Sequence, residues 1–255
     1  MPVELVTVPC LNDNYAFVLK DAQSGRTALL DIPEAAPILA VLSERGWTLD
    51  EVWITHHHAD HSQGLSDVLK AHSAKVRGAA ADQHRLPSLD HAHADNDVFD
   101  FAGHDVMVMD VSGHTIGHIA YHVPDANLVF TADSLMAMGC GRLFEGTADQ
   151  MWNSLSRIAA LPESTLVCSG HEYTAANARF AETIEPDNPA LISRVQDIAD
   201  KRANNQPTVP STLALEQATN PFLRAAEPGI RERLGLKNAT DSEVFAEIRA
   251  RKDAF

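Results

Sequence analysis

Ligand-type side chains are concentrated in one short segment, Thr55-His56-His57-His58-Ala59-Asp60-His61. Four of the chain's 13 histidines and one carboxylate lie within it. Neutral imidazoles and carboxylates are the groups with which proteins bind zinc, iron or manganese. A polar turn whose histidines only satisfy their own hydrogen bonds is the alternative, but such residues contribute little to packing. The segment therefore predicts a metal site.

Single histidines and aspartates follow later predicted strands and could complete this site. Taken alone, each is more often a turn residue, but ligands that hang from neighbouring strand ends can share one site. A structural zinc needs four ligands, whereas this chain offers more, all nitrogen or oxygen. We therefore predict two ions bridged by a carboxylate and a water, ~3.5–4 Å apart as in other two-metal sites. The candidate ligands are His56, His58, Asp60, His61, His114, Asp133 and His171.

The elements that must position these residues can be predicted from apolar patterning. A strand over 49–54 leads into the histidine segment, and a helix over 62–70 leads out of it, with Leu65, Val68 and Leu69 on one face. Further strands are predicted at 3–8, 15–20, 27–32, 75–79, 105–111, 118–123, 127–131 and 165–168. Helices are predicted at 33–45 and 147–161, the second with Thr147 as its N-cap.

Several other features carry weaker predictions. Residues 80–97 are polar, and we interpret His91 and His93 as part of a solvated loop because no further ligand lies close in sequence. Asp31 ends a strand and could either be structural or support a metal ligand from behind, and we favour the structural role. Residues 139–146 are rich in glycine but lack the G-x-G-x-x-G spacing, so a dinucleotide site is not predicted.

The character of the chain changes at Glu172. Beyond it, helices are predicted at 173–184, 189–204 and 242–252, the last with a capping box from Thr240 to Glu243. We predict two domains, a metal-binding catalytic domain over 1–172 and a helical domain over 173–255.

Composition narrows the class of protein. With 45% hydrophobic and 22% charged residues, the chain of 255 residues is typical of a soluble globular protein. No window of 18 apolar residues predicts a membrane span, and the start of the chain is typical of a first strand, not of a signal peptide. The net charge of −15 argues against binding nucleic acid or anionic membranes, so an anionic substrate would need a local cationic cluster. The odd, widely spaced Cys10, Cys140 and Cys168 favour packing roles and a reducing cytoplasm.

The histidine segment resembles the T-H-x-H-x-D-H signature of the metallo-β-lactamase superfamily. The spacing to Gly113-His114-Thr115, Phe130-Thr-Ala-Asp133 and Ser169-Gly-His171 agrees with it. Further segments narrow the resemblance to the glyoxalase II family, over about residues 3–255. These are Gly139-Cys-Gly-Arg-Leu-Phe-Glu-Gly-Thr-Ala-Asp149, Gly170-His-Glu-Tyr-Thr174, Pro207-Thr-Val-Pro-Ser-Thr-Leu213, Asn220-Pro-Phe222 and Arg249-Ala-Arg-Lys-Asp-Ala-Phe255.

The resemblance implies a four-layer αββα sandwich of the α/β class with a C-terminal helical domain. It implies that His56, His58 and His114 bind a first metal ion, that Asp60, His61 and His171 bind a second, and that Asp133 bridges them. Asp60 and Asp133 would be the catalytic carboxylates, and His57 and His118 would lie outside the ligand set. Zinc is the metal we expect first, with iron or manganese as alternatives.

The same resemblance implies hydrolysis of S-(2-hydroxyacyl)glutathione thioesters, typically S-D-lactoylglutathione, to D-lactate and glutathione, the last step of methylglyoxal detoxification. Arg142, Phe144, Tyr173, Arg249 and Lys252 match glutathione-binding positions of the family. Arg249 and Lys252 are three apart on one predicted helix and could grip one carboxylate. Phe144 stands where many relatives have tyrosine, and Arg142 where many have lysine. An arginine can still hold a carboxylate bidentately.

Other activities remain open at this stage. A glutathione persulfide dioxygenase with a single iron would resemble the N-terminal part, and another hydrolase of this fold, a lactonase or β-lactamase, would explain the metal ligands but not the C-terminal helices. A flavo-diiron protein would carry an acidic residue in place of His58. We expect a monomer or weak homodimer.

Overall fold

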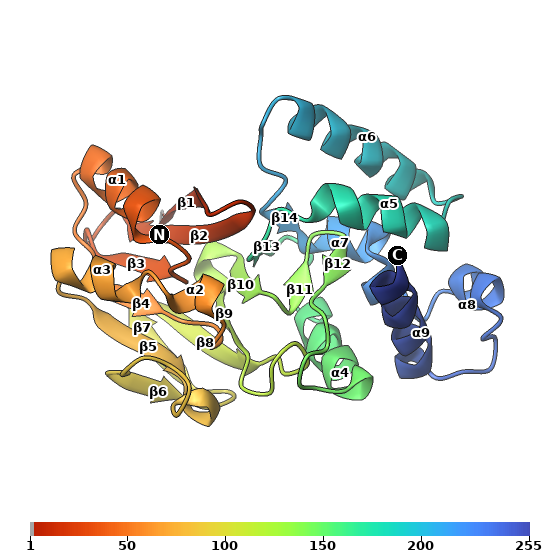
Figure 1. The fold of residues 1–255 in the computed structure, drawn as a ribbon, viewed down its shortest axis with the longest axis horizontal. Helices are drawn as coiled ribbons and strands as arrows, with labels where there is room; N and C mark the ends of the chain where they lie inside the picture. The colour runs from red at the N-terminus through yellow and green to blue at the C-terminus, as the bar shows by residue number, and fades with distance from the viewer. Residues whose placement is uncertain (1–2) are drawn as a thin grey trace. The chain divides into compact units, whose positions relative to one another are not determined.

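The computed structural model describes residues 3–255 and divides into two compact units (Figure 1). The first unit runs to Asp110 and includes Ile116–Ala132, and the second combines Val111–Thr115 with Asp133–Phe255. This division follows spatial contacts and differs from the predicted boundary after residue 172, which follows sequence character and stays a prediction. None of the helices in residues 3–255 is both long and apolar enough to cross a membrane.

The first unit contains a sheet whose strand order follows the sequence, β1-β2-β3-β4-β5-β6. Its strands are β1 (Val3–Cys10), β2 (Asn14–Asp21), β3 (Thr27–Leu30), β4 (Glu51–Trp53), β5 (Lys75–Ala79) and β6 (His91–His93). The first three strands pair antiparallel, whereas β3 to β6 pair parallel. Parallel neighbours need a crossover, and α1 (Ala35–Arg45) connects β3 to β4. Because Leu30 pairs with Trp53, the residues that follow β3 and β4 leave the sheet side by side.

The second sheet of this unit is an antiparallel meander of β7 (Val98–Phe101), β8 (His104–Asp110), β9 (Ile119–Val123) and β10 (Leu128–Ala132), with a 3-10 turn, η2 (Pro124–Ala126), before β10. Buried aromatic side chains join the two sheets. The ring of Trp53 lies 5.2 Å from that of Phe101 and 5.4 Å from that of Tyr121, measured between centroids. The core of the first unit therefore lies between the sheets.

The predicted helix at 62–70 is divided into α2 (Ala59–Ser62) and α3 (Leu65–Ala71) by a close approach at Gly64. A Cβ atom on Gly64 would lie 2.8 Å from Cγ2 of Ile32 and 2.9 Å from N of Ala35, so the chain requires glycine here. The N–H of Ile32 also donates to the carbonyl of His61 over 2.8 Å. These contacts hold α2, which begins inside the histidine segment, against the end of β3.

The prediction of an irregular loop over 80–97 is wrong in part. The segment contains a 3-10 turn, η1 (Ala80–Asp82), and the short strand β6, and β7 follows it. His93 is buried and stacks on Phe99 with centroids 4.8 Å apart, whereas His91 is exposed. The His-Ala-His sequence of β6 lacks β-branched residues, which explains why patterning missed it. His93 is therefore a packed, buried residue and not part of a solvated loop.

The second unit is mostly helical. Its strands are β11 (Leu135–Met136), β12 (Gly139–Cys140), β13 (Leu166–Ser169) and β14 (Ser211–Thr212). Its helices are α4 (Ala148–Ala159), α5 (Thr174–Ile184), α6 (Pro189–Ala203), α7 (Leu213–Thr219), the 3-10 turn η3 (Pro221–Leu223), α8 (Pro228–Leu234) and α9 (Asp241–Ala254). The predicted N-caps are confirmed, since Thr147 and Thr240 each form a capping box, with Gln150 and Glu243.

The core of the second unit forms where α5 and α6 pack on the β11–β12 hairpin. One cluster of buried side chains comprises Met138, Ala178, Ala181, Leu191 and Ile198. Aromatic residues extend the core, with Phe222 centred 6.1 Å from Phe180 and 5.8 Å from Phe245. The helices are therefore packed around the hairpin that follows Asp133.

Candidate functional site

The histidine segment leaves β4 and enters α2, so its side chains gather at the ends of the parallel strands of the first unit. His56 and His61 are buried, and the ring of His56 lies 4.7 Å from that of His58 and 4.3 Å from that of His61. Possible ligand atoms of Asp31, His56 and His61 all lie within 4.8 Å of one another. The structure thus brings the three predicted ligand histidines of this segment together.

Asp31 orients one of these histidines. Its Oδ2 lies 2.8 Å from Nδ1 of His61, and its carboxylate also accepts hydrogen bonds from N and Oγ1 of Thr55, over 2.9 and 2.8 Å. Because a carboxylate only accepts, Nδ1 of His61 carries the proton and Nε2 is the nitrogen that could bind a metal ion. Asp31 also adopts a φ of 55°, in the left-handed region that aspartate tolerates better than most side chains. The predicted structural role of Asp31 is thus only part of its role.

Asp60 is held by Asn14, the first residue of β2. The side-chain amide of Asn14 donates to both the carbonyl and Oδ2 of Asp60, over 3.1 and 3.0 Å. Oδ2 of Asp60 lies 3.8 Å from Nε2 of His61. The contact with Asn14 therefore keeps the carboxylate of Asp60 beside Nε2 of His61, the ring nitrogen that Asp31 does not contact.

His57 and His118 have other contacts. Nδ1 of His57 lies 3.1 Å from Oδ2 of Asp82. The ring of His118 stacks on that of His56 with centroids 4.5 Å apart, and its Nδ1 lies 3.1 Å from the carbonyl of Ile119. These contacts agree with the expectation that both residues support ligands without being ligands.

The second unit carries the other three predicted ligands, His114, Asp133 and His171. All three are buried. Oδ2 of Asp133 lies 3.5 Å from Nε2 of His114 and 3.2 Å from Nε2 of His171. One carboxylate oxygen thus lies between two imidazole nitrogens, a donor set that suits divalent metal ions.

The glycine-rich loop at 139–146 supports His114. Nδ1 of His114 lies 2.8 Å from the carbonyl of Arg142, which leaves Nε2 facing Asp133. A Cβ atom on Gly141 would lie 2.0 Å from the carbonyl oxygen of Asp133 and 2.9 Å from Nδ1 of His114. Only glycine can pass between the backbone of one ligand and the ring of the other.

Polar side chains from the following helices hold the tip of the β11–β12 hairpin. Asn177 of α5 donates to the carbonyl of Ala137 over 3.0 Å. Asn220 donates to the carbonyls of Met136 and Gly139, over 3.1 and 3.0 Å. Because β11 begins two residues after Asp133 and β12 ends two residues before Arg142, these contacts also fix the ends of the hairpin that lead to the site.

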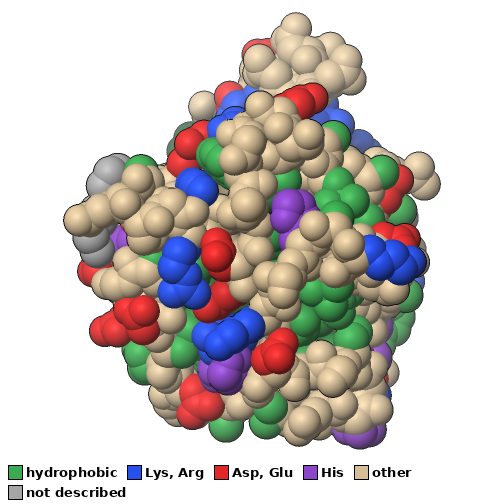
Figure 2. All heavy atoms as spheres, turned by 90° about the vertical axis from the view of Figure 1, so that its left-hand side faces the viewer, with side chains coloured by type: hydrophobic (Ala, Val, Ile, Leu, Met, Phe, Trp, Pro, Cys, Tyr) green, Lys and Arg blue, Asp and Glu red, His purple; other side chains and the backbone are tan. Residues whose placement is uncertain are grey.

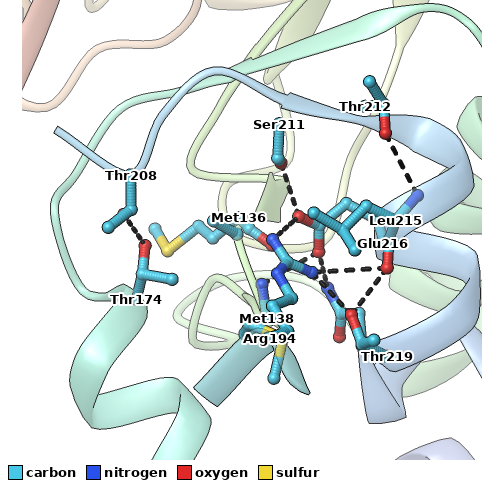
Figure 3. A network of polar contacts seen from close by, with 12 residues as sticks. Met136, Met138, Thr174, Arg194, Thr208, Ser211, Thr212, Leu215, Glu216 and Thr219 are labelled. Atoms are coloured by element: carbon cyan, nitrogen blue, oxygen red, sulfur yellow. Dashed lines mark hydrogen bonds and ion pairs between the residues drawn. The ribbon is translucent and has the colours of Figure 1, made fainter. Parts of the chain in front are cut away.

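Glu216 of α7 is the centre of this support (Figure 3). Its carboxylate accepts the N–H of Met138 over 2.9 Å and the hydroxyl of Ser211 over 2.5 Å, and it pairs with Arg194 of α6. Arg194 also donates to the hydroxyl of Thr219 over 2.6 Å. Both members of the ion pair are buried. Removing one partner of such a pair leaves an uncompensated charge, so the network is sensitive to single substitutions.

The predicted aromatic substrate residues lie on the ligand histidines of the second unit. The ring of Tyr173 stacks on His171 with centroids 4.6 Å apart, and that of Phe144 meets His114 edge to face at 5.2 Å. Phe144 is 62% exposed and Tyr173 39% exposed. Both therefore offer apolar surface beside the ligands.

The predicted cationic residues form a cluster in the second unit. Arg249 is only 5% exposed, and its guanidinium donates to the carbonyl of Cys140 over 3.0 Å and to Asp253 over 2.8 Å. Nζ of Lys252 lies 3.4 Å from the carbonyl of Ala176. Because Arg249 is already engaged in this way, a joint grip of Arg249 and Lys252 on one substrate carboxylate stays a prediction.

Nearby cations affect the pKa of Lys252. Burial, followed by the positive charges of Arg249, Arg179 and Arg142, lowers the pKa of Lys252. On the face shown in Figure 2, by contrast, basic side chains lie beside acidic ones. The cluster of Arg142, Arg179, Arg249 and Lys252 is thus the kind of local positive region that an acidic chain would need to bind an anion.

The three cysteines have no features of nucleophiles. All are buried thiols, and burial raises the pKa of Cys10 and Cys140 to about 11 and that of Cys168 further still. Reactive cysteines have lowered pKa values, so the predicted packing role is supported.

Sequence reasoning did not identify Arg179, Asn14, Asn177 or Glu216, and it gave the orienting role of Asp31 only as the less favoured alternative. Arg179 lies six positions after Tyr173 on the same helical stretch, which is a usable signal. The others act through contacts with residues distant in sequence, which local patterning does not reveal.

Two family models together match residues 21–255, and full-length relatives match the whole chain. Residues 21–171 match the model of the metallo-beta-lactamase superfamily, and residues 172–255 match the model described as hydroxyacylglutathione hydrolase C-terminus. A hydroxyacylglutathione hydrolase from Roseobacter denitrificans is 71% identical over 255 residues, and one from Ruegeria pomeroyi is 62% identical over 255 residues. Each alignment covers 100% of this chain and 100% of the relative.

Solved structures show the same fold. The structure of the BLEG-1 B3 metallo-beta-lactamase superposes with a TM-score of 0.67 at 19% identity, covering 86% of this chain and 99% of that one. The predicted fold class is confirmed as a metallo-β-lactamase fold of the α/β class with a helical C-terminal region. The fold and the His–Asp clusters together suggest metal binding.

Proposed function

The chain belongs to the hydroxyacylglutathione hydrolase family, also called glyoxalase II, and we propose that it hydrolyses S-(2-hydroxyacyl)glutathione thioesters to a 2-hydroxy acid and glutathione. S-D-lactoylglutathione is the substrate we expect, which would place the reaction at the last step of methylglyoxal detoxification, in the cytoplasm. The observation that carries the proposal is the full-length identity of 71% with a hydroxyacylglutathione hydrolase, helical region included.

Seven imidazole and carboxylate side chains would hold two metal ions. His56, His58 and His114 would hold the first ion, Asp60, His61 and His171 the second, and Asp133 would bridge them. The donor chemistry supports this assignment, because every proposed ligand is an imidazole or a carboxylate. The orienting contacts also support it, since Asp31 and the carbonyl of Arg142 each engage Nδ1 of a histidine and leave its Nε2 for the metal. Zinc is the ion we propose, with iron or manganese as alternatives.

Bound ions of this kind would supply a hydroxide at neutral pH and a Lewis acid for the thioester carbonyl. The residues of the chain would orient the reactants. Asp60, fixed by Asn14, would orient the attacking nucleophile by accepting a hydrogen bond from it, and Asp133 would help to hold the ions. The leaving group is a thiolate, and a free thiol has a pKa of ~8.5, so no dedicated general acid is needed.

Residues 173–255 would serve as the glutathione-binding domain, with Arg142 and Phe144 added from the loop at 139–146. Glutathione carries two carboxylates, and the cations of this cluster would attract them. Tyr173 and Phe144 would cover the acyl and peptide portions beside the metal ligands. Phe144 lacks a hydroxyl, so one hydrogen bond that a tyrosine could make to the peptide is absent. We propose a monomer or weak homodimer.

The direct test is the release of thiol from S-D-lactoylglutathione by the purified, metal-loaded protein. Metal-dependent release would support the proposal. Oxygen consumption with glutathione persulfide, without thioester hydrolysis, would instead favour a persulfide dioxygenase with a single iron.

A further inference from the structure

We propose that Arg179 is a further substrate-binding residue, which takes a carboxylate of the glutathione portion beside Lys252. The inference rests on the proposed function and deepens it, since it concerns which side chains determine affinity for the peptide. Four observations in the second unit carry it.

The side chain of Arg179 is exposed and unpaired within residues 3–255. It lies on α5, and within residues 3–255 its guanidinium has no hydrogen-bond or ion-pair partner in the protein. Other arginines of this unit are paired, such as Arg233 with Asp187 and Arg224 with Glu185, each at 2.8 Å. An arginine without a partner is available to a ligand.

The neighbours of Arg179 on α5 contact Lys252. The carbonyl of Ala176, three residues earlier, lies 3.4 Å from Nζ of Lys252, and this nitrogen lies 5.3 Å from the ring centre of Phe180. Residues three apart lie on one side of a helix, so Arg179 extends from the part of α5 that faces the end of α9. The repulsion that Arg179 exerts on Lys252 agrees with this placement.

Positive charges outnumber the negative charges paired with them in the cluster of Arg142, Arg179, Arg249 and Lys252. Among residues 3–255, Asp253 is the acid paired with both Arg249, at 2.8 Å, and Arg142, at 3.9 Å. Arg179 and Lys252 add two further positive charges. Like charges that face each other cost stability, and sequences that tolerate such a conflict often do so at a binding site.

The chemistry of the substrate fits this excess charge. A guanidinium can bind a carboxylate through two parallel hydrogen bonds, whereas an ammonium binds it as a point charge. Arg249 is buried and donates to the carbonyl of Cys140 and to Asp253, so its guanidinium is not open to solvent. Among the arginines of α5 and α9 beside Lys252, Arg179 is the one with an exposed guanidinium that has no protein partner within residues 3–255.

The test compares Arg179→Gln with wild type in the metal-loaded enzyme. We expect KM for S-D-lactoylglutathione to rise about 10-fold, as for the loss of one charge-assisted hydrogen bond, with kcat within about twofold. Binding of glutathione itself, measured by calorimetry without turnover, should weaken by the same factor. Arg179→Lys should recover part of the affinity because it restores the charge.

Arg251→Gln is the matched control. Arg251 is also exposed, its removal changes the net charge equally, and it pairs with Glu247 at 2.8 Å. Equal KM values for Arg179→Gln and Arg251→Gln would overturn the inference, and so would a loss confined to kcat. A substrate esterified at the glycine carboxylate identifies the partner. If the ester abolishes the difference between wild type and Arg179→Gln, the partner is that carboxylate, and if the difference persists, it is the γ-glutamyl carboxylate.

Failure of the inference and failure of the proposed function are distinguishable. If wild type releases no thiol, the function is wrong, and the calorimetric comparison with glutathione still decides whether Arg179 binds the peptide. Absence of glutathione binding to wild type would overturn both.

Discussion

The carboxylate of Asp31 lies 2.8 Å from Nδ1 of His61, and this contact fixes which nitrogen of the histidine faces the proposed metal site. Asp31 follows β3 and His61 follows β4, two strands that pair in parallel, so the sheet itself brings them together. A residue that looked like the end of a strand thus orients a ligand.

Replacing Asp31 should weaken metal binding more than it weakens the fold. We expect Asp31→Asn to lower the affinity for metal about 10- to 100-fold, the usual effect of removing a carboxylate behind a ligand histidine. Competition with a chelator would measure this. Asp90→Asn is the control, because Asp90 accepts the N–H of Val76 over 2.8 Å without touching a histidine. Equal metal affinities in the two variants would contradict the role of Asp31.

A methyl group at Gly141 should disrupt the ligands of the second unit. Because the new Cβ would lie 2.0 Å from the carbonyl of Asp133, Gly141→Ala must displace the loop, Asp133 or His114. A shift of about 1 Å in a catalytic group can cost ~100-fold in rate, so we expect kcat to fall by about that factor. Gly229→Ala meets no atom within 4 Å and should leave turnover of the thioester unchanged. Normal kinetics for Gly141→Ala would show that the loop does not support the site.

The ion pair of Glu216 and Arg194 should contribute strongly to stability. Glu216→Gln leaves the buried Arg194 without its counter-charge, and we expect the free energy of unfolding to fall by about 3–5 kcal/mol. Denaturation by urea would measure the change, and hydrogen exchange should rise at residues 135–140, which the pair supports. Asp187→Asn removes the surface pair with Arg233 and should have little effect. A small effect of Glu216→Gln would mean that the hairpin is held by Asn177 and Asn220 alone.

Substrate affinity should depend on pH through Lys252. Its pKa lies below the ordinary 10.5 because of burial and the charges of Arg249, Arg179 and Arg142, which Asp253 only partly offsets. The positive charge is present below the lowered pKa and is lost as pH rises through it, so KM should rise at a lower pH than it would for an ordinary lysine. Lys252→Gln should have a higher KM at neutral pH and lack this rise. Because the substrate also titrates, the comparison between the two proteins is the informative one, and parallel profiles would contradict the prediction.

The sequence alone predicts some elements and contacts of the molecule and not others. The segment from His56 to His61 was identifiable because its ligands are adjacent in sequence, and Thr147 and Thr240 were identifiable because capping is local. The contact of Asn14 with Asp60 spans 46 residues and that of Glu216 with Met138 spans 78, so both depend on the completed fold. The short β6 and the seven-residue α7 and α8 offered too few residues for a periodic pattern.

We propose that this chain hydrolyses a glutathione thioester with two metal ions held by His56, His58, Asp60, His61, His114, Asp133 and His171. The most direct test is to remove metal with a chelator and titrate it back while following thiol release from S-D-lactoylglutathione and metal content per chain. Activity should be lost on removal and should return fully only near two ions per chain. Full activity without metal, or with one ion per chain, would contradict the proposal.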